Sequence, residues 1–499
     1  MKTNTAIVIG SGFGGLATAI RLQKSGASVT LLEAREKTGG RAYQFQEKGY
    51  TFDMGPSLIT APEIIRELFS FAGKSLEAEL PLIPLDPFYR VYFHDGTYFD
   101  HSGNLEHIKA QLRVWDPRDA DRFDSFMRDT KPLYEAVIEN GLGAEPFDKL
   151  AANLKFLPTL LRLGGLRNHA GFAARYFRDA RSRFLFSFHP LFIGGNPFRV
   201  PAIYQMIPYL EIHGGVLYTR GGMYSLIKAM EKIFLELGGV LKTSTPVEEI
   251  LLEKRKAVGV RANGQAFRSD LVVSNADLGT TYRHLLPESS RKKWTNRRVE
   301  KIDYSMSAFL VYLGVRKKYD KLRHHTIILS PRYRELLRDI FDRKILAEDF
   351  SLYLHVPSRT DDAMAPPGCE SIYALAPVPN LKGPTDWKNV REPFAEKIIS
   401  YLEDWGLPDL RKNLEVRKIF SPEDFKTDLR SMAGNAFGIH PTLTQTAYFR
   451  PHNRSEDIEH LYFTGAGTHP GAGLPGTLLS ARAAMVSILE DFDLKKHAS

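Results

Sequence analysis

The chain has 499 residues, of which 43% are hydrophobic, and this composition is typical of globular proteins with large buried cores. At roughly 150 residues per domain, the length predicts about three domains. The formal net charge of +9 is too small to indicate a nucleic-acid partner, and we expect none. A single cysteine, Cys369, excludes an intrachain disulfide and a Cys-x-x-Cys redox pair, and it favours a reducing compartment.

A glycine-rich loop follows the first apolar run, Ala6 to Ile9, which is typical of a buried parallel strand. The loop reads Gly10-Ser11-Gly12-Phe13-Gly14-Gly15. Gly10 permits a tight turn, Gly12 lets the backbone approach a pyrophosphate, and Gly15 lets the next helix pack closely on the strand. The pyrophosphate would lie on the N-terminal N–H groups of that helix. The pattern predicts a dinucleotide site, which also includes Gly14.

An acidic residue, Glu33, ends the next predicted strand, Ser28 to Leu32. It follows the glycine loop by about 20 residues, the distance typical of a carboxylate that accepts hydrogen bonds from ribose hydroxyls. A carboxylate here favours an unphosphorylated ribose over NADP.

A second glycine pair, Gly39-Gly40, precedes Arg41, and the segment Phe52 to Ser57 follows. Read alone, the pair fits a surface turn with a solvated arginine. Together these segments resemble the FAD-binding front end of the flavoprotein family that contains amine oxidases, protoporphyrinogen oxidase and carotenoid desaturases. The resemblance implies that Gly40 and Arg41 lie along the phosphates of FAD. It also adds a set of flanking residues to the predicted FAD site: Ala34, Arg35, Gly55, Pro56, Ser57 and Val247.

Residues 149–200 combine nine Lys or Arg residues, one acidic residue and eight phenylalanines. Basic residues interleaved with aromatic ones fit a face that rests on an anionic bilayer. An ordinary helical subdomain with solvated arginines fits equally well. Within this stretch, Phe184 to Phe198 contains no Asp, Glu, Lys or Arg, so it would line an apolar pocket, form a portal into lipid or pack as core.

The pattern after Gly222 predicts a helix from Met223 to Leu237, because apolar residues recur at helical spacing on one face. Strands are predicted at Val240 to Lys242 and Val247 to Leu252, and Asn263-Gly264 predicts a hairpin turn. A further strand, Leu271 to Val273, is expected to return to the nucleotide-binding domain.

The predicted fold class is therefore α/β. We expect a discontinuous Rossmann-like FAD-binding domain of residues 1–85, 221–300 and 435–499. An α+β substrate-binding domain of residues 86–148 and 300–434 is inserted into it. Residues 149–220 are expected to form a helical subdomain that faces a membrane or admits the substrate.

The C-terminal segments Leu443 to Asn453 and Leu461 to Gly476 resemble the bacterial-type phytoene desaturases of carotenoid synthesis. Shorter matches are found at Phe186 to His189, Gly194 to Phe198, Arg220 to Gly222 and Ser274 to Asp277, so the resemblance covers nearly the whole chain. Tyr204 to Met223 departs from it and is similar to desaturases of shorter, C30 substrates. The resemblance adds C-terminal residues to the FAD site: Gly465, Gly467, Gly473, Leu474, Pro475, Gly476 and Thr477.

The helix predicted from Thr477 to Leu489 would direct its positive N-terminal end at the flavin ring, which becomes anionic on reduction. By resemblance, the donors would be the backbone N–H groups of Leu474, Gly476 and Thr477. The uncharged run Leu461 to Ala481 is long enough to cross a bilayer, but its prolines and glycines argue against a span.

The resemblance implies an FAD-dependent desaturase that converts phytoene stepwise towards neurosporene and lycopene, by hydride transfer to the flavin and loss of a proton. The sequence contains no second dinucleotide fingerprint, so we expect a quinone or oxygen as the electron acceptor. The candidate proton acceptors are Glu211, His213 and His189, each of which also fits a structural role. No metal site is predicted.

Four alternatives stay open at this point. The substrate could be C30 diapophytoene or a hydroxylated carotenoid. The chain could also be another amine-oxidase-type flavoenzyme, or a non-enzymatic carrier of prenyl lipids, which the intact glycine loops argue against. We expect a cytoplasmic protein bound peripherally to the inner face of a membrane. The sequence leaves open whether the protein forms homo-oligomers.

Overall fold

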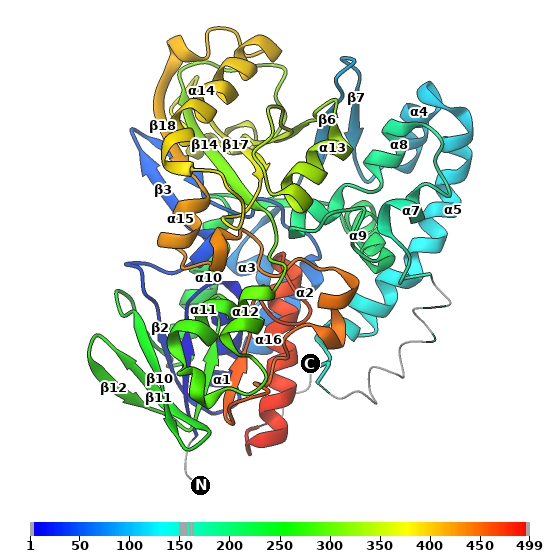
Figure 1. Ribbon diagram of the computed structural model, residues 1–499. Helices are drawn as coiled ribbons and strands as arrows, with labels where there is room; N and C mark the ends of the chain where they lie inside the picture. Colours follow the sequence, from blue (N-terminus) through cyan, green and yellow to red (C-terminus); the bar gives the residue numbers. More distant parts are fainter. Residues whose placement is uncertain (1–3, 149–157, 159–160, 162–163, 496–499) are drawn as a thin grey trace.

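A five-stranded parallel sheet forms the lower part of the molecule in Figure 1. The computed structural model describes residues 4–148, 158, 161 and 164–495. The strands, in their order across the sheet, are β19 (Leu461–Phe463), β13 (Leu271–Ser274), β1 (Thr5–Ile9), β2 (Ser28–Leu32) and β9 (Val240–Lys242). Parallel strands present their carboxyl ends along one edge, which is where ligands bind in such sheets.

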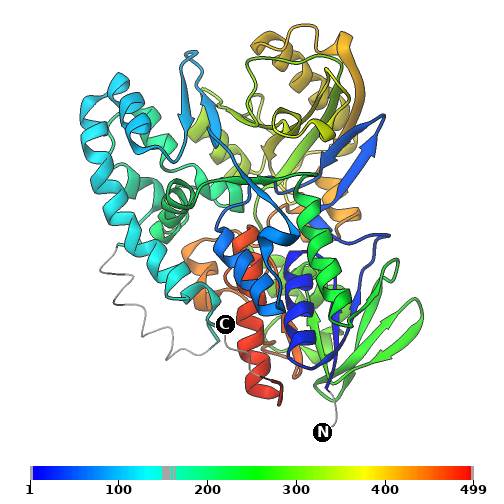
Figure 2. The same ribbon diagram turned by 180° about the vertical axis from the view of Figure 1, so that it is seen from behind.

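Helices cover one face of this sheet and a small antiparallel sheet covers the other. On β1, Ala6 and Val8 pack against the helices, whereas Ile7 and Ile9 pack against the small sheet, as the period of two in a strand requires. Figure 2 shows three of the helices, in red, dark blue and green, side by side in front of the sheet. The helices are α1 (Phe13–Lys24), α2 (Pro62–Ala72), α10 (Met223–Glu236) and α16 (Leu474–Asp491), and the small sheet contains β10 (Val247–Glu253), β11 (Lys256–Ala262) and β12 (Gln265–Arg268).

A seven-stranded mixed sheet forms the upper part of the molecule. Along β14, Phe309 and Val311 pack towards helix α14 (Trp387–Trp405), while Ala308 and Leu310 line a cavity on the opposite face. The strands, in order, are β18 (Leu414–Phe420), β14 (Ser307–Val315), β17 (Glu370–Val378), β16 (Leu352–His355), β15 (His325–Ile328), β6 (Tyr89–Tyr92) and β7 (Tyr98–His101).

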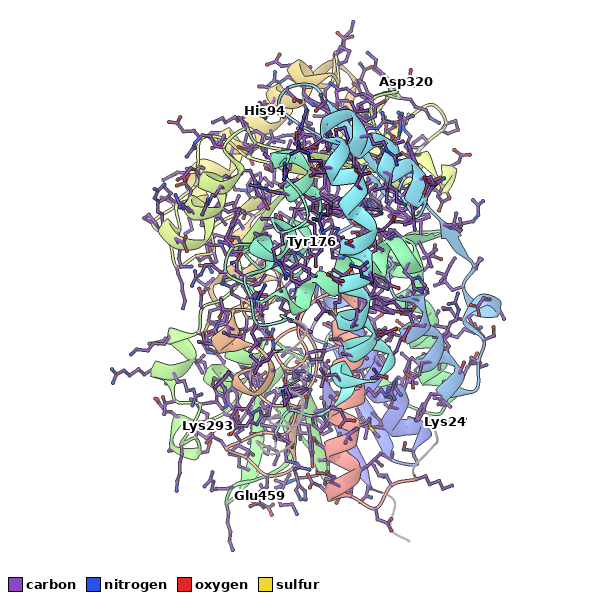
Figure 3. All side chains as sticks on the ribbon, turned by 90° about the vertical axis from the view of Figure 1, so that its right-hand side faces the viewer. Lys24, His94, Tyr176, Lys293, Asp320 and Glu459 are labelled. Atoms are coloured by element: carbon purple, nitrogen blue, oxygen red, sulfur yellow. The ribbon has the colours of Figure 1, made fainter. Side chains whose placement is uncertain are left out.

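A group of helices lies beside the upper sheet, at the right of Figure 1. Figure 3 looks onto this side, where Tyr176 lies next to α5 and its ring centroid is 5.6 Å from that of Phe126. The helices are α4 (Leu105–Trp115), α5 (Pro117–Tyr134), α7 (His169–Ala173), α8 (Ala180–Leu185) and α9 (Met206–Gly214).

Short elements connect these parts. They are β3 (Gln44–Glu47), β4 (Tyr50–Asp53), α3 (Leu76–Glu79), β5 (Leu82–Pro84), β8 (Leu217–Thr219), α11 (Leu278–Thr280), α12 (Asn296–Lys301), α13 (Tyr333–Arg338) and α15 (Pro422–Thr427).

The phenylalanines of residues 149–200 are mostly buried where the structure describes them. Five of them are buried in one core with α5 and β6: Phe172, Phe177, Phe184, Phe186 and Phe188. These five side chains supply the core of the helical part, as the alternative of an ordinary helical subdomain implies, and a membrane-facing role of residues 149–220 stays a prediction. Phe156 lies outside the described residues.

Most of the local sequence predictions hold in the structure. The fold is α/β, the helix after Gly222 and strands β9 and β10 form as expected, and Asn263 and Gly264 both have positive φ in the β11–β12 turn. The parallel sheet draws strands from all three pieces of the predicted FAD-binding domain, whose exact boundaries stay a prediction. Among the described residues, no helix is both long enough and apolar enough to cross a membrane.

Candidate functional site

One cavity of about 500 Å³ extends from the carboxyl edge of the parallel sheet to the seven-stranded sheet. Gly10, Gly12 and Glu33 line one part of it, and Phe188 and Leu337 line another. The cavity brings together most of the predicted FAD-site residues: Gly10, Gly12, Gly14, Glu33, Ala34, Arg35, Gly40, Arg41, Gly55, Pro56, Ser57, Val247, Gly465, Gly473, Leu474, Pro475, Gly476 and Thr477. A dinucleotide site and an apolar chamber are thus continuous.

The turn from β1 into α1 forms the first part of the cavity wall. Gly10 has a φ of +87°, a conformation that favours glycine, and its N–H donates to the Leu32 carbonyl at 2.8 Å. Helix α1 begins at Phe13 with no side-chain cap and no acidic residue in its first turn. Its positive N-terminal end is therefore available to an anionic group in the cavity.

The Glu33 carboxylate is held against this turn. It is 6% exposed and accepts from the Ser11 N–H at 2.9 Å, the Ser11 hydroxyl at 2.5 Å and the Arg35 N–H at 3.0 Å. A carboxylate has about four acceptor positions, so one stays available for a hydroxyl group in the cavity.

Arg41 places unused hydrogen-bond donors at the cavity wall. Its Nη2 donates to Ser431 Oγ at 2.8 Å, but its buried Nε has no partner among the described residues. Burial lowers the pKa of Arg41, while the nearby Asp277 carboxylate opposes that shift. An arginine with a free, desolvated N–H is the donor type that binds phosphate oxygens, so this wall fits the diphosphate of a dinucleotide.

Helix α16 supplies a second helix N-terminus to the cavity. The preceding residue, Gly473, has a φ of +92°, and the N–H groups of Leu474 and Gly476 have no hydrogen-bond acceptor in the described part of the chain. Thr477 differs from the sequence prediction, because its N–H already donates to the Gly473 carbonyl at 2.9 Å inside the first turn. Only Leu474 and Gly476 therefore offer free donors here.

Two of the predicted glycines have packing roles away from the cavity lining. A Cβ on Gly15 would lie 1.9 Å from the Gly10 carbonyl oxygen, so α1 lies against the turn as closely as glycine allows. A Cβ on Gly467 would lie 2.8 Å from Leu278 Cβ. Neither residue lines the cavity.

Asn275 is a site residue that the sequence analysis did not assign. Its side-chain amide lies within 3.1 Å of where a Cβ would stand on Gly12, Gly14, Gly15 or Gly465, and its Nδ2 donates to the Gly10 carbonyl at 3.3 Å. It directly follows strand β13, so its position at the carboxyl edge of the sheet was the available signal.

A buried polar cluster borders the apolar part of the cavity. Glu211 lines the cavity at 1% exposure, and its Oε2 accepts from the Tyr89 hydroxyl at 2.8 Å. His189 Nε2 lies 3.0 Å from the Tyr89 hydroxyl and 3.4 Å from Glu211 Oε2. Burial, together with the Glu211 charge, raises the pKa of Tyr89 well above its usual value. Sequence reasoning missed Tyr89, because no local motif marks it.

His213 is not part of this cluster, and the prediction that it acts in the site is wrong. It lies on α9 two residues after Glu211, which places it near the opposite side of the helix. Its side chain is exposed, stacks on Tyr209 at 5.4 Å between ring centroids and does not line the cavity. His189 reaches the cavity only through Tyr89 and Glu211.

The known proteins that this chain resembles agree with its geometry. Residues 13–489 match the family described as flavin containing amine oxidoreductase. The chain belongs to this family. As a member of the flavin-containing amine oxidoreductases it is a flavoprotein, and the cofactor that its dinucleotide site fits is FAD.

Individual relatives include desaturases of two carotenoid precursors. The chain is 42% identical over 490 residues to a lycopene-forming phytoene desaturase of Pseudescherichia vulneris, covering 97% of this chain and 99% of that one. It is 36% identical over 496 residues to a diaponeurosporene-forming 4,4'-diapophytoene desaturase of Staphylococcus haemolyticus, with 97% and 99% covered. A structure of putrescine oxidase bound to putrescine has a TM-score of 0.64 at 14% identity, with 98% and 99% covered, and shares the fold.

Replacing Gly12 with valine is expected to abolish FAD retention. The new Cβ would stand 3.1 Å from Asn275 Nδ2, and the added methyl groups would occupy the cavity that Gly12 lines. The ratio of flavin absorbance to protein absorbance in purified, folded protein measures the effect. Gly171→Val is the control, because Gly171 is exposed and its Cβ has ordinary contacts. A folded Gly12→Val protein with unchanged flavin content would contradict the assignment.

Proposed function

We propose that this protein is an FAD-dependent carotenoid desaturase that introduces double bonds into phytoene. The observation that carries the proposal is the single cavity that joins the dinucleotide site to an apolar chamber. The identity of 42% with a phytoene desaturase over nearly the full length of both chains supports the same reaction.

The chamber fits a long apolar substrate. Its walls come from the seven-stranded sheet, from α13 and from the helical part, and they carry predominantly hydrocarbon and aromatic side chains: Phe184, Phe188, Leu191, Phe192, Met306, Leu310, Ile327, Leu329, Tyr333, Leu336, Leu337 and Ile340. Such a wall binds hydrocarbon by removing it from water and holds it in an extended channel. A polyene needs no hydrogen-bonding partner, so it brings no polar group of its own that would be buried unpaired.

Bound FAD would supply the hydride-accepting chemistry that the amino acids lack. We assign the binding of the cofactor to three groups: the backbone turn at Gly10, the Arg41 guanidinium and the start of α16. The apolar wall excludes water and orients the carbon chain towards the cofactor end of the cavity.

Glu211 is the residue placed to receive the proton that desaturation releases. Its carboxylate lies on the cavity wall, whereas the hydroxyl of Tyr89 donates to Oε2 and keeps the group oriented. His189 is a positioning residue, since it contacts Tyr89 and Glu211 and not the cavity.

Glu211→Gln is expected to lower kcat by roughly 100- to 10,000-fold, the usual contribution of a general base. The amide keeps the shape of the carboxylate but cannot accept the proton. Turnover is measured on phytoene in liposomes with a quinone present, and flavin content is measured in the same sample. His213→Gln, on the same helix but exposed, is expected to keep the wild-type rate. Equal rates for Glu211→Gln and the wild type would remove Glu211 from the mechanism.

Expression in two carotenoid-accumulating hosts tests the function itself. In a host that accumulates phytoene we expect coloured desaturated products on chromatography of the extracted pigments. In a host that accumulates diapophytoene we expect lower conversion, because identity to the phytoene desaturase exceeds identity to the diapophytoene desaturase. Preferential conversion of diapophytoene would assign the C30 substrate, and conversion of neither would overturn the desaturase function.

We also propose that the protein meets a lipid surface near residues 443–449, on the cytoplasmic side of a membrane. Leu443 is 44% exposed and Phe449 is 64% exposed. Ala447, in the same segment, packs against a small core with Val137, which lines the cavity. A substrate dissolved in lipid would then have a short path into the chamber. A membrane quinone or oxygen is the proposed electron acceptor, and self-association stays a prediction.

Phe449→Asp is expected to weaken binding to anionic vesicles by about tenfold, because a negative charge replaces the exposed apolar ring that would insert into the lipid surface. Co-sedimentation with vesicles measures the bound fraction. Val114→Asp is the matched control, since Val114 is 81% exposed on α4, in a different part of the fold. If both variants lost vesicle binding equally, the change in net charge would explain the loss and the contact surface would be contradicted. Unchanged vesicle binding by Phe449→Asp would also contradict this contact surface.

A further inference from the structure

Three histidines meet in the upper sheet, apart from the cluster around Glu211. His324 directly precedes β15, His325 begins β15 and His355 ends β16. His325 and His355 stand opposite each other in the antiparallel pair, which directs their side chains to the same face. All three side chains are buried, at 6%, 0% and 1% exposure.

The ring nitrogens of these histidines form an arrangement suited to a metal ion. One nitrogen from each residue lies within 4.8 Å of the other two. The Nε2 atoms of His324, His325 and His355 are all buried, and none has a hydrogen-bond partner among the described residues. Three unpartnered nitrogens at one place are costly to bury unless something binds them.

The histidines are held in the protonation state that binds metals. Burial lowers the pKa of His324 to about 3 and the pKa values of His325 and His355 well below 6.5, and the proximity of the rings adds to the shift in the latter two. The imidazoles are therefore neutral at physiological pH, which is the ligand form of histidine.

Hydroxyl groups orient two of the rings from behind. His324 Nδ1 lies 2.6 Å from Thr360 Oγ1, and His325 Nδ1 lies 2.7 Å from the Tyr353 hydroxyl. When Nδ1–H donates to these oxygens, the lone pair is on Nε2. Metal-bound histidines are supported in this way by an acceptor on the other ring nitrogen.

We propose that His324, His325 and His355 bind one divalent transition-metal ion of the zinc class through three imidazole nitrogens. Three neutral nitrogens match the preference of Zn²⁺, with a water molecule as the fourth ligand. The zinc–nitrogen distance of about 2.1 Å requires the nitrogens to lie about 3.4 Å apart, so the rings would move closer together than their present separation of up to 4.8 Å when the ion binds. Asp361, 2% exposed and close enough for its charge to act on His324, offsets part of the positive charge.

The ion would fasten the wall of the substrate chamber. It would link β15, β16 and the segment before β15, while Tyr353 joins His325 to Ser57 Oγ, 2.7 Å from the Tyr353 hydroxyl. Tyr353 and Ser57 both line the cavity. The sequence analysis predicted no metal, because His355 is far from the histidine pair in the sequence.

Zinc binding to the untagged, full-length flavoprotein tests the proposal. After treatment with a chelator and exchange into metal-free buffer, titration with Zn²⁺ is expected to show one ion per chain by mass spectrometry of the metal and by calorimetry. Zinc is also expected to raise the thermal midpoint, because it binds the folded state. Flavin absorbance is recorded in the same samples, so that the outcome does not depend on desaturase activity.

Variants separate this site from adventitious binding. His324→Gln, His325→Gln and His355→Gln are each expected to lose the stoichiometric ion, and His107→Gln, an exposed histidine on α4, is expected to keep it. Thr360→Val preserves shape but removes the oxygen behind His324, and it is expected to weaken zinc binding by roughly 10- to 100-fold. Absence of saturable zinc binding in the wild type, or its retention in all three glutamine variants, would overturn the proposal and leave the histidines as a packed aromatic cluster.

Discussion

The close contact between helix α1 and the end of strand β1 is the constraint on which the functional half of the molecule depends. A Cβ on Gly15 would lie 1.9 Å from the Gly10 carbonyl oxygen, so no other residue permits this approach without movement of the backbone. The contact aims the N-terminus of α1 at the carboxyl edge of the sheet. Asn275 fills the remaining space between glycines of the loop and Gly465. The nucleotide-binding end of the cavity is therefore set by backbone packing before any side chain contributes.

The opposite end of the cavity depends on apolar burial and on the pairing of its few polar groups. Its wall gains stability from apolar burial on both faces of β14, where Phe309 and Val311 face α14 and Ala308 and Leu310 face the chamber. Against this background a polar group is expensive unless it is paired, and Glu211 is paired with Tyr89 at 2.8 Å. The chamber thus combines a hydrocarbon surface with one oriented carboxylate.

Local sequence patterns predicted the nucleotide-binding half well, because its determinants are short-range. The loop Gly10 to Gly15 and the acidic residue Glu33 belong to one consecutive strand–helix–strand unit, and the helix after Gly222 is a single element, so spacing along the chain identifies them. The Thr477 N–H, which was predicted to be a free donor, instead donates to the Gly473 carbonyl within the first turn of α16.

The substrate half was harder to predict, because its contacts join distant segments. Glu211, Tyr89 and His189 meet only through the tertiary fold, and no spacing rule connects them. His213 has the chemistry of a proton acceptor, but its side chain on α9 is exposed and does not line the cavity. The phenylalanines of the helical part carried an ambiguous signal, because a membrane face and a core have the same composition. In the structure, five of these phenylalanine side chains are buried in the core.

The order of strands in the parallel sheet has a consequence for biogenesis. The central strand β1 pairs with β13 and β2, and β13 pairs with β19, which comes from the far end of the sequence together with α16. Because β19 and α16 follow the other strands in the chain, the sheet and the second helix end of the cavity cannot be completed until both have been synthesised. A complete flavin site accordingly requires α16, and before that helix has packed the apolar wall of the unfinished cavity is open to chaperones and proteases.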